Sequence, residues 1–372
     1  MRLGIDASNL RGGGGVTHLS ELLAHADPRA AGFERVTVWS GAPTLRLLPP
    51  RPWLTLAGDP ELEGGLRGRV AWQRHRLSAL ARESCDVLFV PGGTYGGDFH
   101  PYVTMSQNML PFDLRESARY GLSWMLLRLL LLRVAQRRSF QRADGMVYLT
   151  DHARSWIGSG RRTAVIAHGI SERFFRPPKP QRAIGDCSFE RPFTILYTSI
   201  IDVYKHQWNV AESVLRLRAE GVPVRLMLAG GAYPPSMKRL QRVLARDREN
   251  AVTLLGEVPH ADVARLYHEA DAFVFASTCE NMPNILLEAM AAGLPIACSS
   301  KPPMPQLLGG DGVYFDPLRV DDISRALREL IADPERRARL AAGAFEHARA
   351  YSWERCARET FAFLASVAEE RA

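Results

Sequence analysis

The chain contains few lysines and few cysteines, and it has no long hydrophobic run. Only four of its 47 basic residues are lysine, and its five cysteines are scattered, odd in number and without a C-x-x-C pair. This usage argues against a disulfide framework or a zinc site and favours reduced thiols in a cytoplasmic protein. The chain contains no stretch of about 18 apolar residues, so we predict no transmembrane helix. The first ten residues include Arg2 and Asp6, so they read as a strand and not as a signal peptide.

Charge is unevenly distributed along the 372 residues. The net charge is +7, yet residues 1–182 carry 25 basic and 15 acidic side chains, so the remainder is slightly acidic. A basic N-terminal half attracts anionic lipid, nucleic acid or an anionic acceptor. We find no recognised nucleic-acid motif, so nucleic acid is not an expected partner. A hydrophobic content of 46% and a charged content of 23% are typical of a soluble globular protein.

Short apolar segments alternate with helical ones along the whole chain. Residues 2–7, 36–39, 86–90, 102–105 and 145–149 read as strands of a first series, and a second series begins near Phe193. This alternation predicts an α/β protein with parallel sheets covered by helices on both faces. Pro177-Pro178-Lys179-Pro180 reads as the linker and hinge between two Rossmann-like domains that face each other across a cleft.

The most informative stretch is the segment from Cys279 to Pro295. An apolar run at 272–276 predicts a buried strand, and a helix follows, with Pro283 in its first turn and Gly293 at its end. Glu280 then lies in the loop before the helix, and Glu288 lies about two turns along it. Free N–H groups at such a helix start suit an anionic or polyhydroxyl ligand.

Two other segments carry features of a ligand site. Gly12–Gly15 follows the first strand and precedes a helix, so its bare backbone permits close approach of a phosphate or sugar; the alternative is a flexible turn. Lys205 follows the strand at 194–198 and so lies at the carboxyl edge of a parallel sheet, where ligands bind. The alternative for Lys205 is a solvated loop lysine.

The segment with Glu280 and Glu288 resembles the E-x7-E motif of retaining glycosyltransferases with the GT-B fold, specifically glycosyltransferase family 4. Five more segments resemble motifs of that family in the same order along the chain: Gly12–Gly15, Val165–Ile170 with Phe174, Ile195–Lys205, Leu226–Gly231 and Leu254–Tyr267. The resemblance therefore covers nearly the whole sequence. It implies a GT-B fold with an acceptor-binding domain over residues 1–178, a donor-binding domain over residues 179–352, and a helix at about 353–372 that packs back on the first domain.

The resemblance also implies roles for individual residues. Lys205 neutralises the donor diphosphate, Glu280 holds hydroxyls of the donor sugar, and Glu288 accepts hydrogen bonds from the ribose. The implied catalytic residues are Glu280, Lys205 and Asn108. The implied donor-binding residues are Gly14, Gly15, Ser199, Lys205, His206, Gly230, Val258, Glu280, Asn281, Met282, Pro283, Asn284, Leu287 and Glu288.

Two positions depart from the family pattern. Ile200 stands where the family has an arginine, so either Lys205 acts with His206 and helix N–H groups, or an arginine comes from elsewhere. No histidine stands near Asn108, where many family members place one against the donor sugar, so Asn108 or Gln107 is the expected substitute. His168 replaces the family asparagine and is expected to be structural. No D-x-D pair occurs in the chain, which agrees with chemistry that needs no metal or other cofactor.

The sequence thus predicts a retaining hexosyltransferase that uses a nucleoside-diphosphate sugar, with mannose as the first choice, to build a surface polysaccharide. The alternatives are a sugar-nucleotide 2-epimerase and a catalytically degenerate scaffold. The stretch Arg119–Arg142, rich in leucine and arginine, reads either as a helix on an anionic membrane surface or as a core helix with a solvated arginine side. The first reading predicts a peripheral protein on the inner face of the cell membrane, with a glycan or lipid-linked acceptor.

Overall fold

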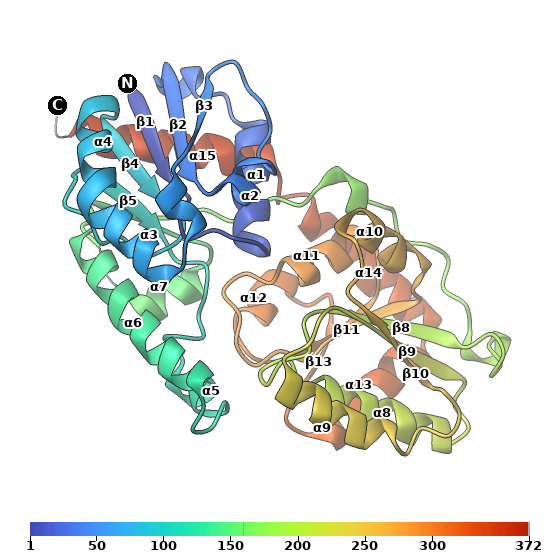
Figure 1. Cartoon of the computed structure of the whole chain (residues 1–372). Helices are drawn as coiled ribbons and strands as arrows, with labels where there is room; N and C mark the ends of the chain where they lie inside the picture. The colour runs from blue at the N-terminus through green and yellow to red at the C-terminus, as the bar shows by residue number, and fades with distance from the viewer. Residues whose placement is uncertain (159, 371–372) are drawn as a thin grey trace. The chain divides into compact units, whose positions relative to one another are not determined.

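The computed structural model describes residues 1–158 and 160–370. Its contacts divide the chain into two compact units. Unit 1 comprises Met1–Ser117, Gly121–Gly169 and Tyr351–Ala372, and unit 2 comprises Ala118–Tyr120 and Ile170–Ala350. Each unit is built on one parallel sheet, as the alternating pattern of the sequence predicts (Figure 1).

Unit 1 holds a seven-stranded parallel sheet. Its strands, in spatial order, are β3 (Leu54–Gly58), β2 (Arg35–Ser40), β1 (Arg2–Asp6), β4 (Val87–Val90), β5 (Tyr102–Met105), β6 (Gly145–Tyr148) and β7 (Arg162–Val165). The central strands β4, β5 and β6 are buried at every residue, because helices cover both faces of the sheet. The strand order changes direction between β1 and β4, so this is where loops at the carboxyl edge diverge to leave room for a ligand.

Helices cover both faces of the first sheet. They are α1 (Gly14–His25), α2 (Ala42–Leu45), α3 (Leu66–Trp72), α4 (Ser78–Ser84), α5 (Leu114–Ala118), α6 (Trp124–Arg142), α7 (Asp151–Ile157) and α15 (Trp353–Glu369). Figure 1 shows α15, in red, behind the sheet, with α3 and α4 in front of it. The end of the chain thus lies in unit 1, where the sequence placed the final helix, although residues 371–372 of that helix lie outside the described part.

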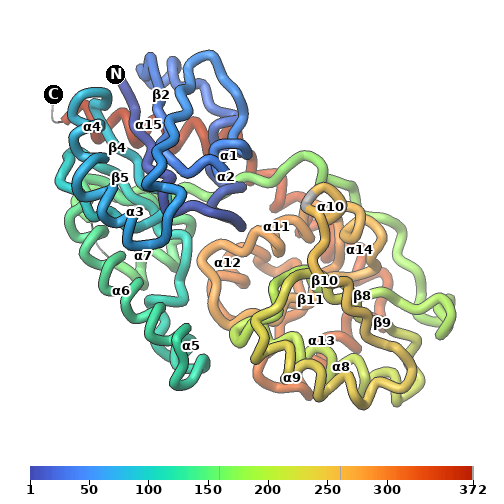
Figure 2. The backbone as a smooth tube through the Cα atoms, in the orientation of Figure 1, coloured from blue at the N-terminus to red at the C-terminus, as the bar shows by residue number. Residues whose placement is uncertain are grey.

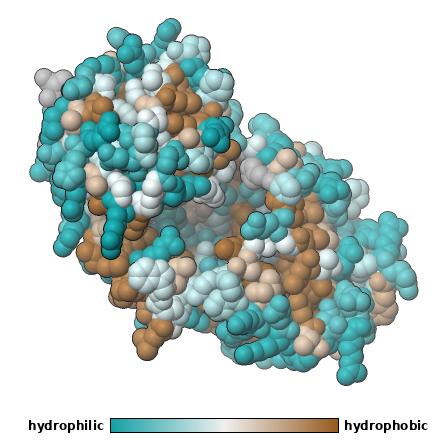
Figure 3. Space-filling model, in the orientation of Figure 1, coloured by the Kyte–Doolittle hydropathy of each residue, from teal (hydrophilic) through white to brown (hydrophobic). Residues whose placement is uncertain are grey.

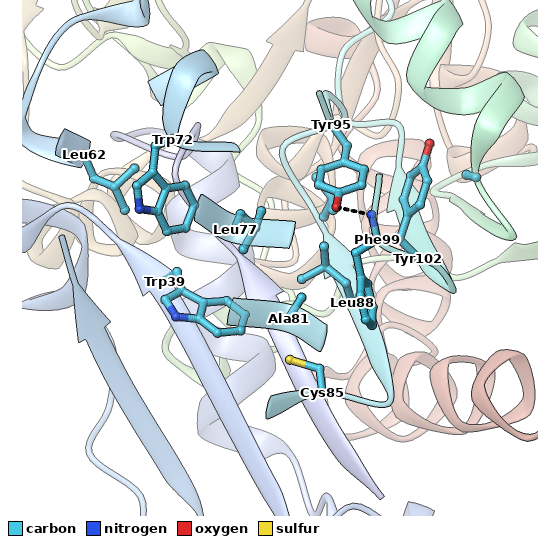
Figure 4. Close-up of a cluster of buried hydrophobic side chains, with 12 residues drawn as sticks. Trp39, Leu62, Trp72, Leu77, Ala81, Cys85, Leu88, Tyr95, Phe99 and Tyr102 are labelled. Carbon is cyan, nitrogen blue, oxygen red and sulfur yellow. Dashed lines mark hydrogen bonds between the residues drawn. The ribbon is translucent and has the colours of Figure 1, made fainter. Parts of the chain in front are cut away.

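A cluster of aromatic and aliphatic side chains forms a core of unit 1 between the sheet and α3–α4 (Figure 4). Trp72 is fully buried, and its indole N–H donates to the Asp59 carboxylate at 2.9 Å. The Tyr95 hydroxyl accepts a hydrogen bond from the backbone N–H of Phe99 at 3.0 Å. Each of these polar groups is satisfied inside the core, as burial of a polar atom requires.

Unit 2 holds a six-stranded parallel sheet in the order β10 (Val252–Gly256), β9 (Val224–Ala229), β8 (Phe193–Thr198), β11 (Ala272–Phe275), β12 (Ile296–Ser299) and β13 (Val313–Phe315). Its helices are α8 (Gln207–Ala219), α9 (Pro234–Leu244), α10 (His260–Glu269), α11 (Asn284–Ala291), α12 (Met304–Leu308), α13 (Val320–Ala332) and α14 (Pro334–Ala348). Figure 2 shows α8 and α9 side by side, and α8 also packs on α13. The order changes direction between β8 and β11, which gives unit 2 its own switch point.

Apart from the short stretch Ala118–Tyr120, the chain passes between the units at Gly169–Ile170 and at Ala350–Tyr351, and not at the predicted Pro177–Pro180 linker. The proline-rich stretch is tied into unit 2. The Arg176 N–H just before it donates to the Ala291 carbonyl at 2.9 Å, and Lys179 Nζ lies 3.5 Å from the Asp271 carboxylate. Composition alone suggested a linker because prolines break regular structure, but these contacts anchor the stretch to α11 and to the sheet. The predicted boundary at residue 178 therefore moves to residue 169.

Candidate functional site

The loops at the switch point of unit 2 bring together most of the predicted site. One loop runs from the end of β8 to α8 and carries Ser199 and Lys205, and the other runs from β11 to α11 and carries Glu280. The two strands are hydrogen-bonded neighbours, so their carboxyl ends open side by side. Ligands of open parallel sheets bind at this kind of edge.

Lys205 and Glu280 form an ion pair across the switch point. Their side chains are 7% and 12% exposed, and Nζ of the lysine contacts Oε1 of the glutamate. The ammonium also lies 4.9 Å from the centre of the Tyr204 ring and 5.1 Å from that of Phe275, in reach of cation–π attraction. The sequence assigned the two residues separate duties, whereas in the structure each neutralises the other.

His206 follows Lys205 and begins α8 in an unusual backbone conformation. Its φ of 52° lies in the left-handed region, which costs a residue with a side chain about 1–2 kcal/mol. Its Nε2 lies 3.1 Å from Thr278 Oγ1, in the second loop of the site. Burial, with the nearby charges of Arg119 and Arg239, lowers the pKa of His206 to about 3, so the ring is neutral at physiological pH.

Glu288 lies one turn into α11 and is fixed by a hydrogen-bonded chain. The Tyr267 hydroxyl, from α10, donates to Oε2 of Glu288 at 2.9 Å and pairs with Thr198 Oγ1 at the end of β8 at 2.5 Å. Burial raises the pKa of Glu288 to about 7, although the Tyr267 hydrogen bond and the charge of Arg173 oppose the rise. The hydrogen bond from Tyr267 thus reaches one carboxylate oxygen of Glu288, Oε2.

The start of α11 differs slightly from the prediction. Pro283 is the residue before the helix and not part of its first turn, with φ −79° and ψ 97°, and the helix begins at Asn284. Asn281 and Met282 are buried in the preceding loop. Leu287 is buried at 1% exposure in the core of unit 2, so its side chain serves packing and is closed to a ligand. The spacing of residues in the sequence did not show that the Leu287 side chain is buried.

The remaining predicted residues of unit 2 lie at the ends of neighbouring strands. Ser199 directly follows β8, Gly230 directly follows β9, and Val258 lies two residues after β10. Gly230 has a φ of 140°, and a side chain there would collide with the Ser199 carbonyl oxygen. The glycine thus lets the ends of β8 and β9 approach each other closely.

Three predicted residues belong to unit 1. Gly14 and Gly15 begin α1, and a Cβ at Gly15 would lie 3.0 Å from Gln107 Oε1, so the glycine loop lies beside Gln107. Asn108 is exposed, and its Oδ1 accepts from the Leu110 N–H at 3.0 Å, which is how a polar residue closes a turn. Gln107, the alternative to Asn108, is therefore the residue that approaches the glycine loop.

The structure adds residues that sequence reasoning missed. Tyr267 ends the segment Leu254–Tyr267, which resembles a motif of the family. Only the fold shows that its hydroxyl donates a hydrogen bond to Glu288. Tyr120, in the segment that belongs to unit 2, packs edge-on against Tyr233 at 5.5 Å and hydrogen-bonds Asp202. No local pattern connects these positions, because they are far apart in sequence. In the described part of the chain, no group of three or more His, Cys, Asp or Glu side chains is arranged to hold a metal ion.

Two units, each with a parallel sheet and a switch-point site, define the GT-B fold class, and a solved structure agrees. The chain superposes on HepE from Anabaena, solved with UDP and glucose, with a TM-score of 0.70 and 17% identity over 98% of this chain and 100% of that one. At this identity the likeness shows the fold alone. The GT-B fold predicted from the sequence is thereby confirmed.

Sequence comparisons show what part of the chain is similar to known proteins. Residues 187–347 match the family described as Glycosyl transferases group 1. O-antigen chain mannosyltransferase B of Escherichia coli is 35% identical over 113 residues, which is 30% of this chain and 30% of that protein. A D-inositol 3-phosphate glycosyltransferase of Corynebacterium urealyticum is 28% identical over 262 residues, 64% of this chain and 61% of that protein. The matched stretches thus span less than two thirds of both relatives.

Proposed function

We propose that this chain is a retaining, metal-independent glycosyltransferase. It moves a hexose, with mannose as the first choice, from a nucleoside-diphosphate sugar to a hydroxyl of a glycan or lipid-linked acceptor in surface-polysaccharide biosynthesis. The observation that carries the proposal is the meeting of Lys205, Glu280 and the Glu288–Tyr267 pair at the switch point of unit 2. The group 1 match over residues 187–347 and the likeness to an O-antigen mannosyltransferase support it.

Each of these groups suits one part of a sugar nucleotide. In the proposal, Glu288 accepts hydrogen bonds from the ribose hydroxyls, because a carboxylate is an acceptor with two oxygens. Lys205 stabilises the charge that develops on the leaving diphosphate, and Glu280 binds hydroxyls of the sugar. The glycine loop at Gly14 and Gly15 and the neighbouring Gln107 belong to the acceptor-binding unit.

The first experiment identifies the donor. We would measure thermal shifts with UDP-, GDP-, ADP- and dTDP-sugars in EDTA, on the wild type and on Glu288→Gln. A ligand at about 100 times its dissociation constant stabilises the fold by about 2.7 kcal/mol. A shift for one nucleotide class that is lost in Glu288→Gln supports the proposal, and persistence in EDTA supports the metal-independent part. No shift with any donor would favour the degenerate scaffold.

The second experiment separates transfer from epimerisation. The chosen donor is incubated with and without a mannosylated glycan acceptor, and NMR follows the anomeric signals. Transfer with the anomeric configuration of the donor kept is the expected result. An inverted product would overturn the retaining mechanism. An epimerised sugar nucleotide formed without acceptor would replace the proposal by the 2-epimerase.

The proposal also assigns a role to the exposed surface of α6, as the part of unit 1 that meets a lipid-linked acceptor. Trp124, Leu127, Leu131 and Val134 repeat at helical spacing and are all exposed, with Trp124 at 74%, and Arg128 lies among them. Figure 3 shows hydrophobic side chains along the edge of unit 1 where α6 runs. No helix of the described chain has the length and hydropathy to cross a bilayer. We infer that this face rests on an anionic lipid surface, where leucine and tryptophan enter the interface and arginine meets lipid phosphates.

Vesicle sedimentation tests this contact with matched variants. Trp124→Ala on α6 should weaken binding to vesicles that contain anionic lipid, whereas Trp156→Ala, at another exposed tryptophan of unit 1, should leave it unchanged. Binding should also fall as salt rises, because screening weakens the arginine contacts. Equal binding by both variants, or no binding at low salt, would remove the membrane surface from the proposal.

A further inference from the structure

Asp6 is a buried carboxylate at the switch point of unit 1. It is the last residue of β1, at the carboxyl edge where the strand order changes direction, and it is 1% exposed. Among the residues that the structure describes, no lysine, arginine or histidine pairs with it. Burial raises the pKa of Asp6, although hydrogen bonds from Ser8 and Gln73 oppose the rise. Because a carboxylate without a cation is costly to bury, these hydrogen bonds have to compensate it.

The groups that face Asp6 donate hydrogen bonds to both of its oxygens. The Ser8 N–H donates to Oδ1 at 3.0 Å, and the Gln73 amide donates to Oδ2 at 2.5 Å. Nε2 of Gln73 also lies 3.2 Å from the Thr94 carbonyl oxygen, which only accepts, so this end of the amide is its NH2 group. The position therefore requires a side chain that only accepts, as a carboxylate does. An asparagine there would turn an N–H group toward one of the two donors.

The same network joins the two loops that leave the switch point. Ser8 and Asn9 belong to the loop after β1, which leads to the glycine loop Gly12–Gly15, and Thr94 belongs to the loop after β4. Nδ2 of Asn9 donates to Thr94 Oγ1 at 2.9 Å. A Cβ at Gly92 would lie 3.1 Å from Cβ of Asn9, so the backbones of the two loops approach closely. The segment before the glycine loop is thus fixed against its neighbour.

Gln73 comes from an irregular part of the helical layer of unit 1. It is 3% exposed and begins the π-helical segment Gln73–Leu77 between α3 and α4. Such turns within α-helices frequently occur at functional sites. Here the turn carries a side chain that reaches Asp6 and both loops, with Nε2 also 3.3 Å from Ser8 Oγ.

We propose that Asp6 is a positioning residue of the acceptor site, acting through Gln73 and Ser8 on the conformation of the glycine loop. This role deepens the proposed function and rests on it, because the proposed function places the glycine loop in the acceptor-binding unit. At 1% exposure Asp6 is closed to a ligand, so it contributes by fixing the loops and not by contact with the substrate. Fixed loops matter for transfer, because a displacement of about 1 Å can cost about 100-fold in rate.

The test compares two buried carboxylates of unit 1. Asp144 is 12% exposed, lies 2.6 Å from His100 Nδ1, accepts from the Tyr102 N–H at 3.0 Å, and precedes β6 at the opposite edge of the sheet. Transfer kinetics use the mannosylated glycan and the sugar nucleotide that gives the thermal shift, and calorimetry gives the dissociation constant of that nucleotide. We expect kcat/KM for the acceptor to fall about 10- to 100-fold in Asp6→Asn. We expect changes of less than about twofold in its nucleotide affinity and in kcat/KM of Asp144→Asn.

Gln73→Met tests whether Asp6 acts through the amide. The variant keeps the length of the side chain and the Asp6 carboxylate but removes the donor to both loops, so it should reproduce the kinetic loss. The double variant with Asp6→Asn should lose little more than either single variant, because residues of one network are not additive. Hydrogen exchange should be faster at residues 7–15 and 91–98 in both single variants, whereas Asp144→Asn should spare these loops.

The results distinguish the role of Asp6 from the proposed function itself. The role is rejected if Asp6→Asn lowers kcat/KM no more than Asp144→Asn, or if nucleotide affinity falls in parallel with it. If Asp6→Asn does not fold, Gln73→Met takes its place in the same comparison. A wild type that transfers no sugar defeats the proposed function, and the exchange pattern then decides: loops that exchange equally in Asp6→Asn and Asp144→Asn reject the positioning role.

Discussion

Replacing Lys205 with methionine should strongly destabilise unit 2. The change keeps the length of the side chain but removes the only positive charge in contact with the Glu280 carboxylate among the described residues. Two unit charges 4 Å apart at an effective dielectric of 20 attract by about 4 kcal/mol. Breaking a buried pair by removing one partner costs about 3–5 kcal/mol, because the other charge stays buried. With side chains 7% and 12% exposed, this pair qualifies as buried.

A control variant and a double variant test whether the loss of stability comes from the Lys205–Glu280 pair. Lys238→Met removes an exposed lysine from α9 of the same unit and should change stability by less than about 0.5 kcal/mol. Adding Glu280→Gln to Lys205→Met removes the stranded carboxylate and should recover most of the loss. The double variant then measures the coupling between the two charges.

Hydrogen exchange read by mass spectrometry is the appropriate assay, because it reports each unit separately. Unit 2 peptides of Lys205→Met should lose about 3–5 kcal/mol of protection, and unit 1 peptides should keep theirs. The melting temperature of unit 2 should fall by about 6–20 °C. If Lys205→Met costs no more than Lys238→Met, or if the double variant is as unstable as the single, the pair is not the buried electrostatic link that the structure shows.

Three further predictions follow from buried or constrained positions. Because the pKa of Glu288 is raised to about 7, nucleotide affinity should fall as pH drops from about 8 to 6, and calorimetry should find Glu288→Gln weak at both values. His18 is fully buried, neither ring nitrogen has a hydrogen-bond partner among the described residues, and burial lowers its pKa well below the ordinary value. Unfolding below about pH 6.5 therefore takes up a proton. Urea melts of unit 1 should show full stability above about pH 6.5 and a loss of up to about 1.4 kcal/mol for each pH unit below it. This pH dependence should be weaker in His18→Leu. Gly230→Ala should cost unit 2 at least about 1–3 kcal/mol in chemical denaturation, whereas Gly310→Ala, with open space around it, should be nearly neutral.

The sheets could be predicted from the sequence because their strands carry the signal locally. Segments such as Phe193–Thr198 and Ala272–Phe275 are short apolar runs that are buried at every residue. Their parallel direction followed from the alternation of strands and helices, because parallel strands need crossover connections. The linker could not be placed this way, because Pro177–Pro180 looks like a connection until its contacts with Ala291 and Asp271 are known.

The positions of the candidate site residues in the fold were predictable from the sequence, but their electrostatic pairing was not. The strand–loop–helix pattern put Glu280, Glu288 and Lys205 at one edge of a sheet, and the fold keeps them there. The pairing of Lys205 with Glu280 needs the distance between two loops that are 75 residues apart.

The resting ion pair has a consequence for the substrate under the proposed function. A nucleoside diphosphate alone offers an anion to Lys205, and taking up that anion leaves the Glu280 carboxylate without its cation in a site where both side chains are almost closed to water. A sugar nucleotide offers hydroxyl donors to Glu280 at the same moment, so it compensates both charges. The cost of opening a buried pair then falls on ligands that lack the sugar. Discrimination between a nucleoside diphosphate and its sugar conjugate therefore follows from the pair itself, and product release after transfer is favoured because the pair can close again.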